Sequence, residues 1–398
     1  MQEKAKEPEI RFAGFTGAWE QRKLGELSDI IGGGTPSTGN STYWDGNINW
    51  YSPAEISNQI FLSASQRKIS ELGYSSCSAK ILPKGTVLFT SRAGIGKTAI
   101  LAEEGCTNQG FQSIVPHTNE LDSYFIFSRT SELKKYGEVV GAGSTFVEVS
   151  GKQMAAMTLM MPPSINEQKV IGSFFKRLDT LLTLHQRKYE KLLNIKKSML
   201  EKMFPKEGEV VPEIRFKGFT GAWEQRKFGE MANRRSEVSA SGNLPRVEYE
   251  DIVSGTGTLN KDVFEKQSQK QGIVFHSGDV LYGKLRPYLQ NWLLASFNGL
   301  AVGDFWVLEP QGLNSNYLYR IIQTKQFDEI ANQSVGTKMP RADWKLVSKA
   351  TFLNPASFNE QRLIGKFFKD IDSLLTLHQR KLEMLKNVKQ AFLEKMFV

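Results

Sequence analysis

The sequence predicts a mixed α/β (α+β) protein made of two globular domains and two long helices, arranged as an internal duplication. Three observations support this prediction: one segment occurs twice, a second segment occurs twice, and the regions between the copies share a register of glycine and apolar positions. At 398 residues the chain is also longer than a single hydrophobic core usually supports.

The repeated segments define the domain boundaries. The first, called the frame segment, reads PEIRFAGFTGAWEQRKLGEL at residues 8–27 and returns at 212–231 with 17 of 20 positions identical. The second covers residues 166–204 and returns at 359–397 with 26 of 39 positions identical. We expect a globular domain at 1–165, a helix at 166–204, a linker at 205–211, a second globular domain at 212–358 and a second helix at 359–398.

The two intervening regions are expected to share one backbone and to differ on their surfaces. An offset of 193 aligns Gly85 with Gly278 and Tyr124 with Tyr317, so most of the 11-residue length difference should lie between positions 28 and 84. The runs GTVLFT, TAILA, GDVLYG and NWLLA have the composition of strands. Residues 121–140 and 314–330 have helical spacing.

Both repeated helices carry an apolar stripe whose positions advance by alternating threes and fours, as in a coiled-coil seam. Each helix would be ~57 Å long, and we expect the two to pack antiparallel with pseudo-two-fold symmetry. The predicted seam consists of Ile171, Phe174, Leu178, Leu181, His185, Leu192, Ile364, Phe367, Ile371, Leu374, His378 and Leu385.

His185 and His378 lie at the midpoints of the two helices, so they should meet in an antiparallel pair and help to fix its register. A metal or catalytic site is the alternative. However, no HExxH motif, cysteine cluster or carboxylate pair accompanies these histidines or the other two, His117 and His276. We therefore predict a structural role and no metal site.

The composition disfavours a secreted or membrane-spanning chain. No run of 18 apolar residues occurs, and the N-terminal MQEKAKEPEI is charged where a signal peptide would be apolar. Cys77 and Cys106 form neither a disulfide framework nor a metal-ligand pattern. We expect a cytoplasmic protein.

The net charge of +9 favours a polyanionic partner, and it is concentrated in the helices. Residues 166–204 hold nine Lys or Arg against four Asp or Glu, and residues 359–397 hold eight against five. The regions between the repeats are nearly neutral, with ten against eleven at 28–165 and fourteen against twelve at 232–358.

The run SRAGIGKTAI, residues 91–100, resembles the end of a phosphate-binding P-loop, which needs GxxxxGK followed by Ser or Thr. Gly96, Lys97 and Thr98 match that end, but Ser91 stands where the leading glycine belongs. We favour a glycine-rich loop between strands and keep a nucleotide-binding loop as the alternative.

Taken together, these features make the chain similar to the specificity (S) subunits of type I restriction-modification enzymes over essentially its whole length. The signals are GFTGAWEQRK before each variable region, RAGIGKTAI, TNQGFQSIVP and GSTF in the first region, GDVLYGKLRPYLQN and GTKMPRADW in the second, and NEQ at the start of each helix. The resemblance implies a non-catalytic DNA-reading protein. Each variable region would be a target recognition domain for one half of a bipartite asymmetric site, and the helices would set the distance between the halves.

The resemblance also implies the partners and cofactors. The partners would be double-stranded DNA, two modification (methyltransferase) subunits and restriction (translocase and nuclease) subunits. S-adenosylmethionine, ATP and Mg²⁺ would be bound by those subunits and not by this chain. Because nearly neutral domains make few phosphate contacts, the partner subunits would complete the clamp around DNA.

The candidate DNA-binding residues are cations and hydroxyl groups on the glycine-bearing loops. They are Thr35, Arg92, Lys97, Ser144 and Thr145 in the first domain, and Lys284, Arg286, Tyr288, Lys338 and Arg341 in the second. The alternative for each is a solvated loop residue or a group that only positions the DNA backbone.

Two questions stay open at this level. The frame aromatics Phe15, Trp19, Phe219 and Trp223 could form a partner-docking patch or pack between domain and helix. A P-loop NTPase and a purely structural coiled-coil scaffold remain as other functions, although a scaffold gives no reason for two domains with one backbone and divergent loops.

Overall fold

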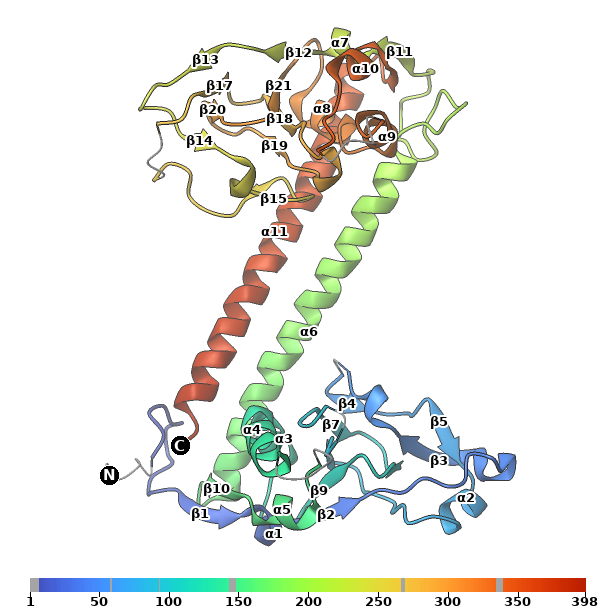
Figure 1. Cartoon of the computed structure of the whole chain (residues 1–398), viewed down its shortest axis with the longest axis vertical. Coiled ribbons are helices and arrows are strands. Elements are labelled where there is room, and N and C mark those ends of the chain that lie inside the picture. Colours follow the sequence, from blue (N-terminus) through green and yellow to red (C-terminus); the bar gives the residue numbers. More distant parts are fainter. Residues whose placement is uncertain (1–6, 58, 93, 143–147, 266–268, 334–338) are drawn as a thin grey trace. The chain divides into compact units, whose positions relative to one another are not determined.

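The computed structural model describes residues 7–57, 59–92, 94–142, 148–265, 269–333 and 339–398. The chain forms two compact units, which we call unit 1 (Met1–Leu184 with Leu382–Val398) and unit 2 (His185–Lys381). Each unit holds one mixed α/β domain and a part of both long helices (Figure 1). The division therefore falls inside the helices and not at the domain boundaries expected from the sequence, because each helix packs one of its ends into each domain core.

Unit 1 contains a five-stranded sheet in the order β2-β9-β6-β7-β4, a three-stranded sheet in the order β5-β3-β8 and the ribbon β1-β10. The strands are β1 (Glu20–Lys23), β2 (Ser28–Gly32), β3 (Trp44–Tyr51), β4 (Phe61–Leu62), β5 (Arg67–Ile69), β6 (Val87–Phe89), β7 (Thr98–Leu101), β8 (Cys106–Thr107), β9 (Gln112–Pro116) and β10 (Thr158–Met161). The short helices are α1 (Leu24–Leu27), α2 (Glu71–Ser75), α3 (Ser123–Ser128), α4 (Thr130–Gly141) and α5 (Gly151–Ala156).

Unit 2 contains two four-stranded sheets, in the orders β12-β21-β18-β19 and β13-β17-β20-β14, and the ribbons β11-β22 and β15-β16. The strands are β11 (Glu224–Lys227), β12 (Ala232–Arg235), β13 (Val238–Ser239), β14 (Arg246–Val247), β15 (Ile252–Val253), β16 (Thr258–Leu259), β17 (Gly272–Phe275), β18 (Val280–Gly283), β19 (Trp292–Leu294), β20 (Gly299–Ala301), β21 (Phe305–Pro310) and β22 (Thr351–Asn354). The short helices are α7 (Phe228–Met231), α8 (Ser315–Ile321), α9 (Lys325–Ala331) and α10 (Trp344–Lys349).

The two domains repeat one strand arrangement, so the internal duplication holds in three dimensions as well as in sequence. The order β2-β9-β6-β7 in unit 1 corresponds to β12-β21-β18-β19 in unit 2, and the ribbon β1-β10 corresponds to β11-β22. The offset is 204 residues from β2 to β12 and 193 from β6 to β18. The 11-residue difference therefore lies between these strands, as predicted, and it gives the domains different secondary sheets.

The strands expected at GTVLFT, TAILA, GDVLYG and NWLLA are confirmed as β6, β7, β18 and β19. Residues 121–140 form two helices and not one, because Arg129 between α3 and α4 has φ −91° and ψ 18°, outside the helical region. Residues 314–330 also divide, into α8 and α9. There the Thr324 side chain accepts a hydrogen bond from the Phe327 N–H and starts the second helix.

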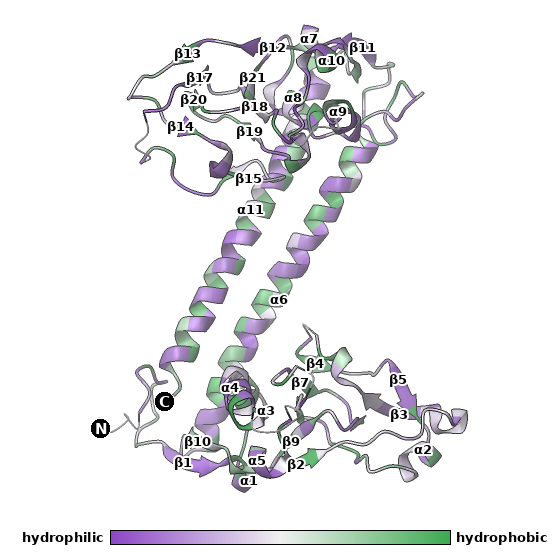
Figure 2. Ribbon diagram, in the orientation of Figure 1, coloured by the Kyte–Doolittle hydropathy of each residue, from purple (hydrophilic) through white to green (hydrophobic). Residues whose placement is uncertain are grey.

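The long helices are α6 (Ile165–Lys202) and α11 (Phe358–Lys395), with 38 residues each. Polar and apolar residues alternate along both (Figure 2). In unit 1 the Phe174 ring lies 4.9 Å from the Phe392 ring, and Asp179 pairs with Lys389. Rising residue numbers along α6 thus meet falling numbers along α11, so the two segments are antiparallel. No helix in the described part of the chain is long and apolar enough to span a membrane.

Each unit has its own hydrophobic core. In unit 1 the core includes Trp19, Phe175 and Met396, and in unit 2 it includes their counterparts Trp223, Phe368 and Met203. The residue that directly follows one long helix therefore completes the core into which the first turns of the other helix pack.

Candidate nucleic-acid interface

The frame segments attach the start of each long helix to its domain. Arg11 donates to the Glu167 carboxylate from Nε and Nη2, at 2.7 and 2.8 Å. Arg215 makes the same two bonds to Glu360, at 2.6 and 2.8 Å. Only 1% of each glutamate side chain is exposed. The same buried ion pair is thus built twice.

The frame segments also hold the end of the opposite helix. The Ile10 N–H donates to the carbonyl of Lys395 in the last turn of α11, at 3.0 Å. The Ile214 N–H donates to the carbonyl of Lys202 in the last turn of α6, at 2.9 Å. Each frame segment therefore joins the first turn of one long helix to the last turn of the other.

The two frame tryptophans pack in the hydrophobic cores of the units. Trp19 and Trp223 are buried, with ring centroids 6.3 Å from Phe397 and 6.0 Å from Phe204, respectively. An exposed docking patch is therefore wrong for them. Phe15 and Phe219 are half-buried.

The two midpoint histidines meet, as the sequence predicted. The Nδ1 atoms of His185 and His378 are 2.8 Å apart. One of these atoms must donate and the other accept, so at least one imidazole is neutral in this contact. Burial lowers the pKa of His185, and the neighbouring His378, Lys381 and Lys188 lower it further.

The predicted seam is wrong at alternate positions. Leu181 and Leu374 are 43% and 44% exposed, whereas the next residues, Leu182 and Leu375, turn inward. Phe174 is half-buried and does contact α11 through Phe392, as predicted, and Phe367 is half-buried as well, whereas the adjacent Phe175 and Phe368 are fully buried in the domain cores. Because the sequence has apolar residues at both positions of each pair, its spacing could not decide between a step of three and a step of four. Of the other predicted residues, Ile171, Leu178, Ile364 and Ile371 are buried, and Leu192 and Leu385 are half-buried.

A buried carboxylate in unit 1 joins three elements, and we call it the Asp179 junction. Asp179 of α6 lies 2.6 Å from the Lys389 Nζ of α11. It also accepts a hydrogen bond from the Tyr124 hydroxyl of α3 at 3.0 Å. The α/β domain of unit 1 is thereby tied to both long helices.

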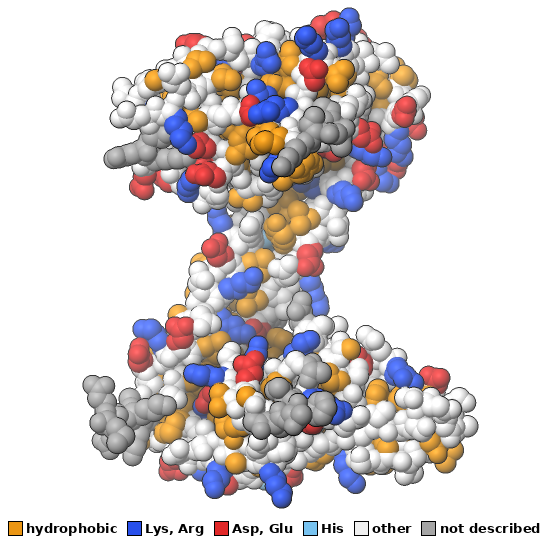
Figure 3. All heavy atoms as spheres, viewed as in Figure 1, with side chains coloured by type: hydrophobic (Ala, Val, Ile, Leu, Met, Phe, Trp, Pro, Cys, Tyr) orange, Lys and Arg blue, Asp and Glu red, His pale blue; other side chains and the backbone are white. Residues whose placement is uncertain are grey.

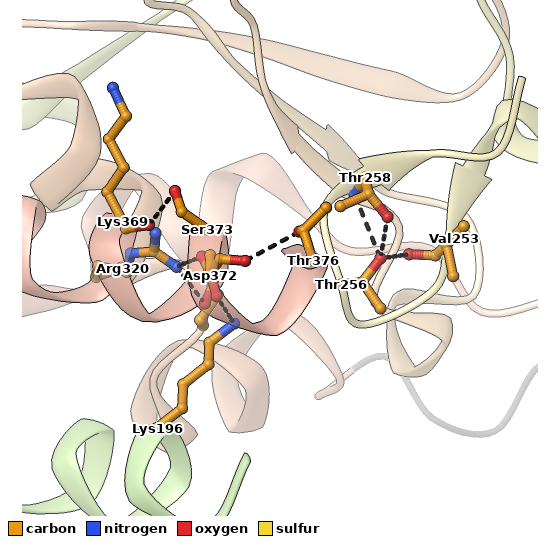
Figure 4. A network of polar contacts seen from close by, with 10 residues as sticks. Lys196, Val253, Thr256, Thr258, Arg320, Lys369, Asp372, Ser373 and Thr376 are labelled. Carbon is orange, nitrogen blue, oxygen red and sulfur yellow. Dashed lines mark hydrogen bonds and ion pairs between the residues drawn. The ribbon is translucent and has the colours of Figure 1, made fainter. Parts of the chain in front are cut away.

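The corresponding Asp372 junction in unit 2 uses a different third group (Figure 4). Asp372 of α11 lies 2.7 Å from the Lys196 Nζ of α6 and 2.7 Å from Arg320 Nη1 of α8. Burial lowers the pKa of Lys196, while the Asp372 carboxylate acts in the opposite direction. At an offset of 193 Arg320 stands where unit 1 has Phe127, so this junction holds two cations for one carboxylate.

Each domain presents one hairpin loop at the same place in its sheet. An isolated β-bridge joins Arg92, in the loop between β6 and β7, to Glu148. An isolated β-bridge likewise joins Leu285, in the loop between β18 and β19, to Arg341. Both pairs differ by the same offset of 193. These loops carry five of the candidate DNA-binding residues: Arg92, Lys97, Lys284, Arg286 and Tyr288.

The nucleotide-binding alternative for the first loop is wrong. Gly96 and Lys97 lead directly into strand β7, which pairs antiparallel with β6. A P-loop must instead open a helix, so that the helix N-terminus faces the phosphates.

The first domain brings Thr35 and the hairpin loop to one segment, residues 107–110. The Gly34 N–H donates to the Thr107 carbonyl at 2.9 Å, and the Ser91 N–H donates to the Gly110 carbonyl at 2.9 Å. Between these points the Thr35 hydroxyl donates to the side-chain oxygen of the exposed Gln109. Gln109 was not among the predicted residues, although its amide belongs to the class that reads adenine. Arg92 is half-buried and Lys97 is exposed.

The second domain brings all four of its described candidates together. Lys284 and Arg341 lie 3.4 and 3.0 Å from the two oxygens of Asp304. Arg286 and Tyr288 are exposed on the same loop. Hydrophobic side chains lie beside Lys and Arg on the viewed face of unit 2 (Figure 3). Asp304 was not among the predicted residues. It lies 20 residues after Lys284 along the chain, and no motif in the sequence marks their contact.

The remaining candidates, Ser144, Thr145 and Lys338, lie outside the described residues and stay predictions.

The two domains share one backbone, and each presents a differently built polar loop. The sequence model described as the type I restriction modification DNA specificity domain matches residues 17–194 and again residues 221–387. The chain belongs to this family, and its two α/β domains are DNA target recognition domains.

Individual relatives agree with this assignment. The chain is 26% identical over 407 aligned residues to the type I restriction enzyme MjaIX specificity subunit of Methanocaldococcus jannaschii, covering 95% of this chain and 92% of that protein. It is 27% identical over 193 residues to the EcoR124I/EcoR124II specificity subunit of Escherichia coli, covering 44% and 47%. Its fold is similar to that of the type I restriction-modification S subunit from M. genitalium, with a TM-score of 0.67, 15% identity and coverage of 98% and 99%.

Proposed function

We propose that the chain reads a bipartite, asymmetric DNA site, with one half-site per recognition domain, and performs no chemistry itself. One observation carries the proposal: corresponding hairpin loops occupy the same place in two matching sheets, yet they have different side chains. A shared backbone sets where each loop lies, whereas different side chains set which bases it contacts. Two unlike loops would therefore read two unlike half-sites.

Adenine methylation would be carried out by two modification subunits that bring S-adenosylmethionine, and cleavage by restriction subunits that use ATP and Mg²⁺. We place this complex in the cytoplasm. Because both recognition domains are nearly neutral, the partner subunits would supply the remaining phosphate contacts.

A repeated apolar surface on the long helices supports two copies of one partner. Leu181 and Leu184 of α6 stay exposed, and so do their counterparts Leu374 and Leu377 of α11. Four exposed leucines in two equivalent pairs indicate a binding surface that is used twice. We assign each pair to one modification subunit.

Domain exchange tests the reading function. Residues 28–165 are replaced by the matching region of another family member, and the methylated sites are mapped by methylome sequencing in cells that supply the partner subunits. We expect one half-site to change and the other to stay. The reciprocal exchange of residues 232–358 should change the other half alone. If either exchange alters both halves, the domains do not read DNA independently.

Leucine substitutions test the stoichiometry. The variant Leu181→Ser with Leu184→Ser should bind one modification subunit in place of two, because only the α11 pair remains apolar. The same result is expected for Leu374→Ser with Leu377→Ser. The mass of the purified complex is the readout. Leu193→Ser is the matched control, because Leu193 is equally exposed on α6 but its counterpart is Lys386. Full binding of both subunits by either double variant would contradict this assignment.

A further inference from the structure

We propose that the hairpin loop Arg286–Gln290 of the second recognition domain is a wedge that enters the base stack of the DNA half-site read by that domain. The inference rests on the proposed DNA-reading function and deepens it, since it assigns a mechanical role to particular residues. Four features of the loop support it: its backbone, its exposed tip, the cations around it, and its contrast with the loop of the first domain.

The loop backbone is held in a conformation that residues with a Cβ rarely adopt. Arg286 and Gln290 both have left-handed backbones, with φ of 49° and 55°. The surrounding structure imposes this shape: the Arg286 N–H donates to the Pro340 carbonyl at 2.8 Å, and the Gln290 carbonyl accepts from the Gly255 N–H at 3.0 Å. An unfavourable backbone conformation persists where neighbouring contacts hold it in place. Such conformations are concentrated at ligand-binding sites. The loop is therefore a pre-shaped element.

The tip of this fixed loop presents apolar surface to solvent. Pro287 is buried beneath it, whereas Tyr288 is 56% exposed and Leu289 is 39% exposed. Proteins that bend DNA insert apolar side chains such as leucine between base pairs, and aromatic rings stack on unpaired bases.

The surroundings of the tip suit a duplex better than an apolar protein surface. Lys284 and Arg341 flank the loop, both oriented by Asp304, and Arg286 is exposed at its start. Asp304 pairs with Lys284 and Arg341, and together with Arg286 these four groups carry a net positive charge, as contact with phosphates requires. The apolar tip then lies where the base stack would be, between phosphate-binding side chains.

Residues 94–97, the described part of the corresponding loop in the first domain, present no such tip. Ile95 stands where the second domain has Tyr288, and it is buried against Gly137 of α4. Gly96 stands in the position of Leu289, and a Cβ there would lie 2.3 Å from the Lys134 side chain. That loop is packed down on its own domain. The wedge is thus expected at one half-site only, and the other half-site serves as an internal control.

The experiment uses the full chain in complex with its modification subunits and duplexes that carry the mapped methylation site. The fluorescent adenine analogue aminopurine, which brightens when it is unstacked, is placed in turn at each base step of the two half-sites outside the methylated adenine and its neighbours, because a methyltransferase extrudes its target base from the stack. We expect brightening at one step of the second half-site and none in the first. A mismatch at that step should tighten binding by about tenfold, because the cost of unstacking is then removed in advance.

The variant Tyr288→Ala with Leu289→Ala should lose the fluorescence signal, and the mismatched duplex should restore its affinity to within about twofold of wild-type. Tyr288→Phe should retain the signal, because the ring remains. Leu346→Ala, which removes an equally exposed leucine from α10 of the same domain, should change nothing.

The outcomes separate the two proposals. Sequence-specific binding of both half-sites without brightening at any step of the second would overturn the wedge and leave the proposed function standing. Brightening that survives the double alanine variant would also overturn the wedge. If the wild-type complex shows no preference for any sequence, the proposed function fails, and the wedge fails with it.

Discussion

The first turns of the two long helices and the two hairpin loops show opposite outcomes of the same duplication. At the helix starts, Arg11 with Glu167 and Arg215 with Glu360 repeat one ion pair to within 0.1 Å per contact. At the hairpin loops the backbone bridges are kept, but Tyr288 is exposed where Ile95 is buried. Contacts that hold the frame together were retained after duplication, and surfaces that face solvent were free to diverge.

The Asp179 and Asp372 junctions lie between these extremes. The Lys–Asp pair is kept in both, with distances of 2.6 and 2.7 Å. The third group is not kept: a tyrosine hydroxyl serves Asp179, and the Arg320 guanidinium serves Asp372. The helix-to-helix contact is therefore common to both copies, whereas the helix-to-domain contact was remade in each.

The largest expected effect comes from removing one copy. Residues 1–211 lack Met396 and Phe397, which complete the core of unit 1. The counterparts Met203 and Phe204 directly follow α6, so a second half-chain can fill the same place in an isologous dimer. Two identical recognition domains related by a two-fold axis must read an inverted repeat. We expect a dimer that, with modification subunits, methylates a palindromic bipartite site.

Light scattering at micromolar concentration and methylome sequencing check this prediction. A monomeric half-chain, or methylation of an asymmetric sequence, would show that the two copies are not interchangeable.

The next effect tests whether the two helix starts are energetically equal. Glu167→Gln and Glu360→Gln should each lower the free energy of unfolding by about 3 kcal/mol, because the half-buried guanidinium of Arg11 or Arg215 loses its buried countercharge. Urea unfolding of the full chain is the measurement. Glu26→Gln breaks an exposed pair with Arg22 and should have no measurable effect. If Glu167→Gln and Glu360→Gln lower the free energy of unfolding by clearly different amounts, the two ion pairs differ in energy despite their similar geometry.

A smaller effect on the free energy of unfolding should distinguish the Asp179 junction from the Asp372 junction. Among the described residues, Lys389→Met leaves the Tyr124 hydroxyl as the partner of the Asp179 carboxylate, whereas Lys196→Met leaves Asp372 paired with Arg320. We expect Lys389→Met to be the more destabilising by about 1 kcal/mol. Matched urea denaturation curves give the difference, and adding Arg320→Met to the Lys196→Met variant should remove the advantage. Equal losses for the two lysine variants would show that Arg320 does not stabilise Asp372.

The smallest effect concerns the contact between His185 and His378, which are counterparts in the two copies. The pKa of His185 is lowered below its ordinary value of 6.5 in the folded chain. Its neutral form therefore stabilises the fold fully above pH 6.5, and this stabilisation is lost as the pH falls below that value. Replacing both His185 and His378 by Leu should remove this pH dependence, strengthen helix association and loosen the register.

Thermal unfolding between about pH 5 and 8 measures the dependence. His117→Asn, at an exposed pair with Asp29, is the control. A pH profile that is unchanged in the double leucine variant would assign the effect to other groups.

Much of the architecture was predictable because the sequence contains two copies of one unit, which can be compared with each other. Two copies at fixed offsets identified the frame segments, the long helices and the shared strands, and the coincidence of two midpoints placed His185 against His378. Single residues were less predictable. Asp304 and Gln109 act through contacts with residues distant in sequence, and neither has a counterpart of its own type in the other copy.

The sequence by itself determined the duplication, the strands of β6, β7, β18 and β19, and the antiparallel helix pairing, because periodicity and repetition are properties of the chain alone. Only the tertiary structure decided which of two adjacent apolar residues faces inward, as with Leu181 and Leu182. It also decided which tip residue is exposed, Tyr288 or its counterpart Ile95. Both choices depend on what packs against the residue, and for Ile95 that is Gly137 of α4, more than 40 residues away along the chain.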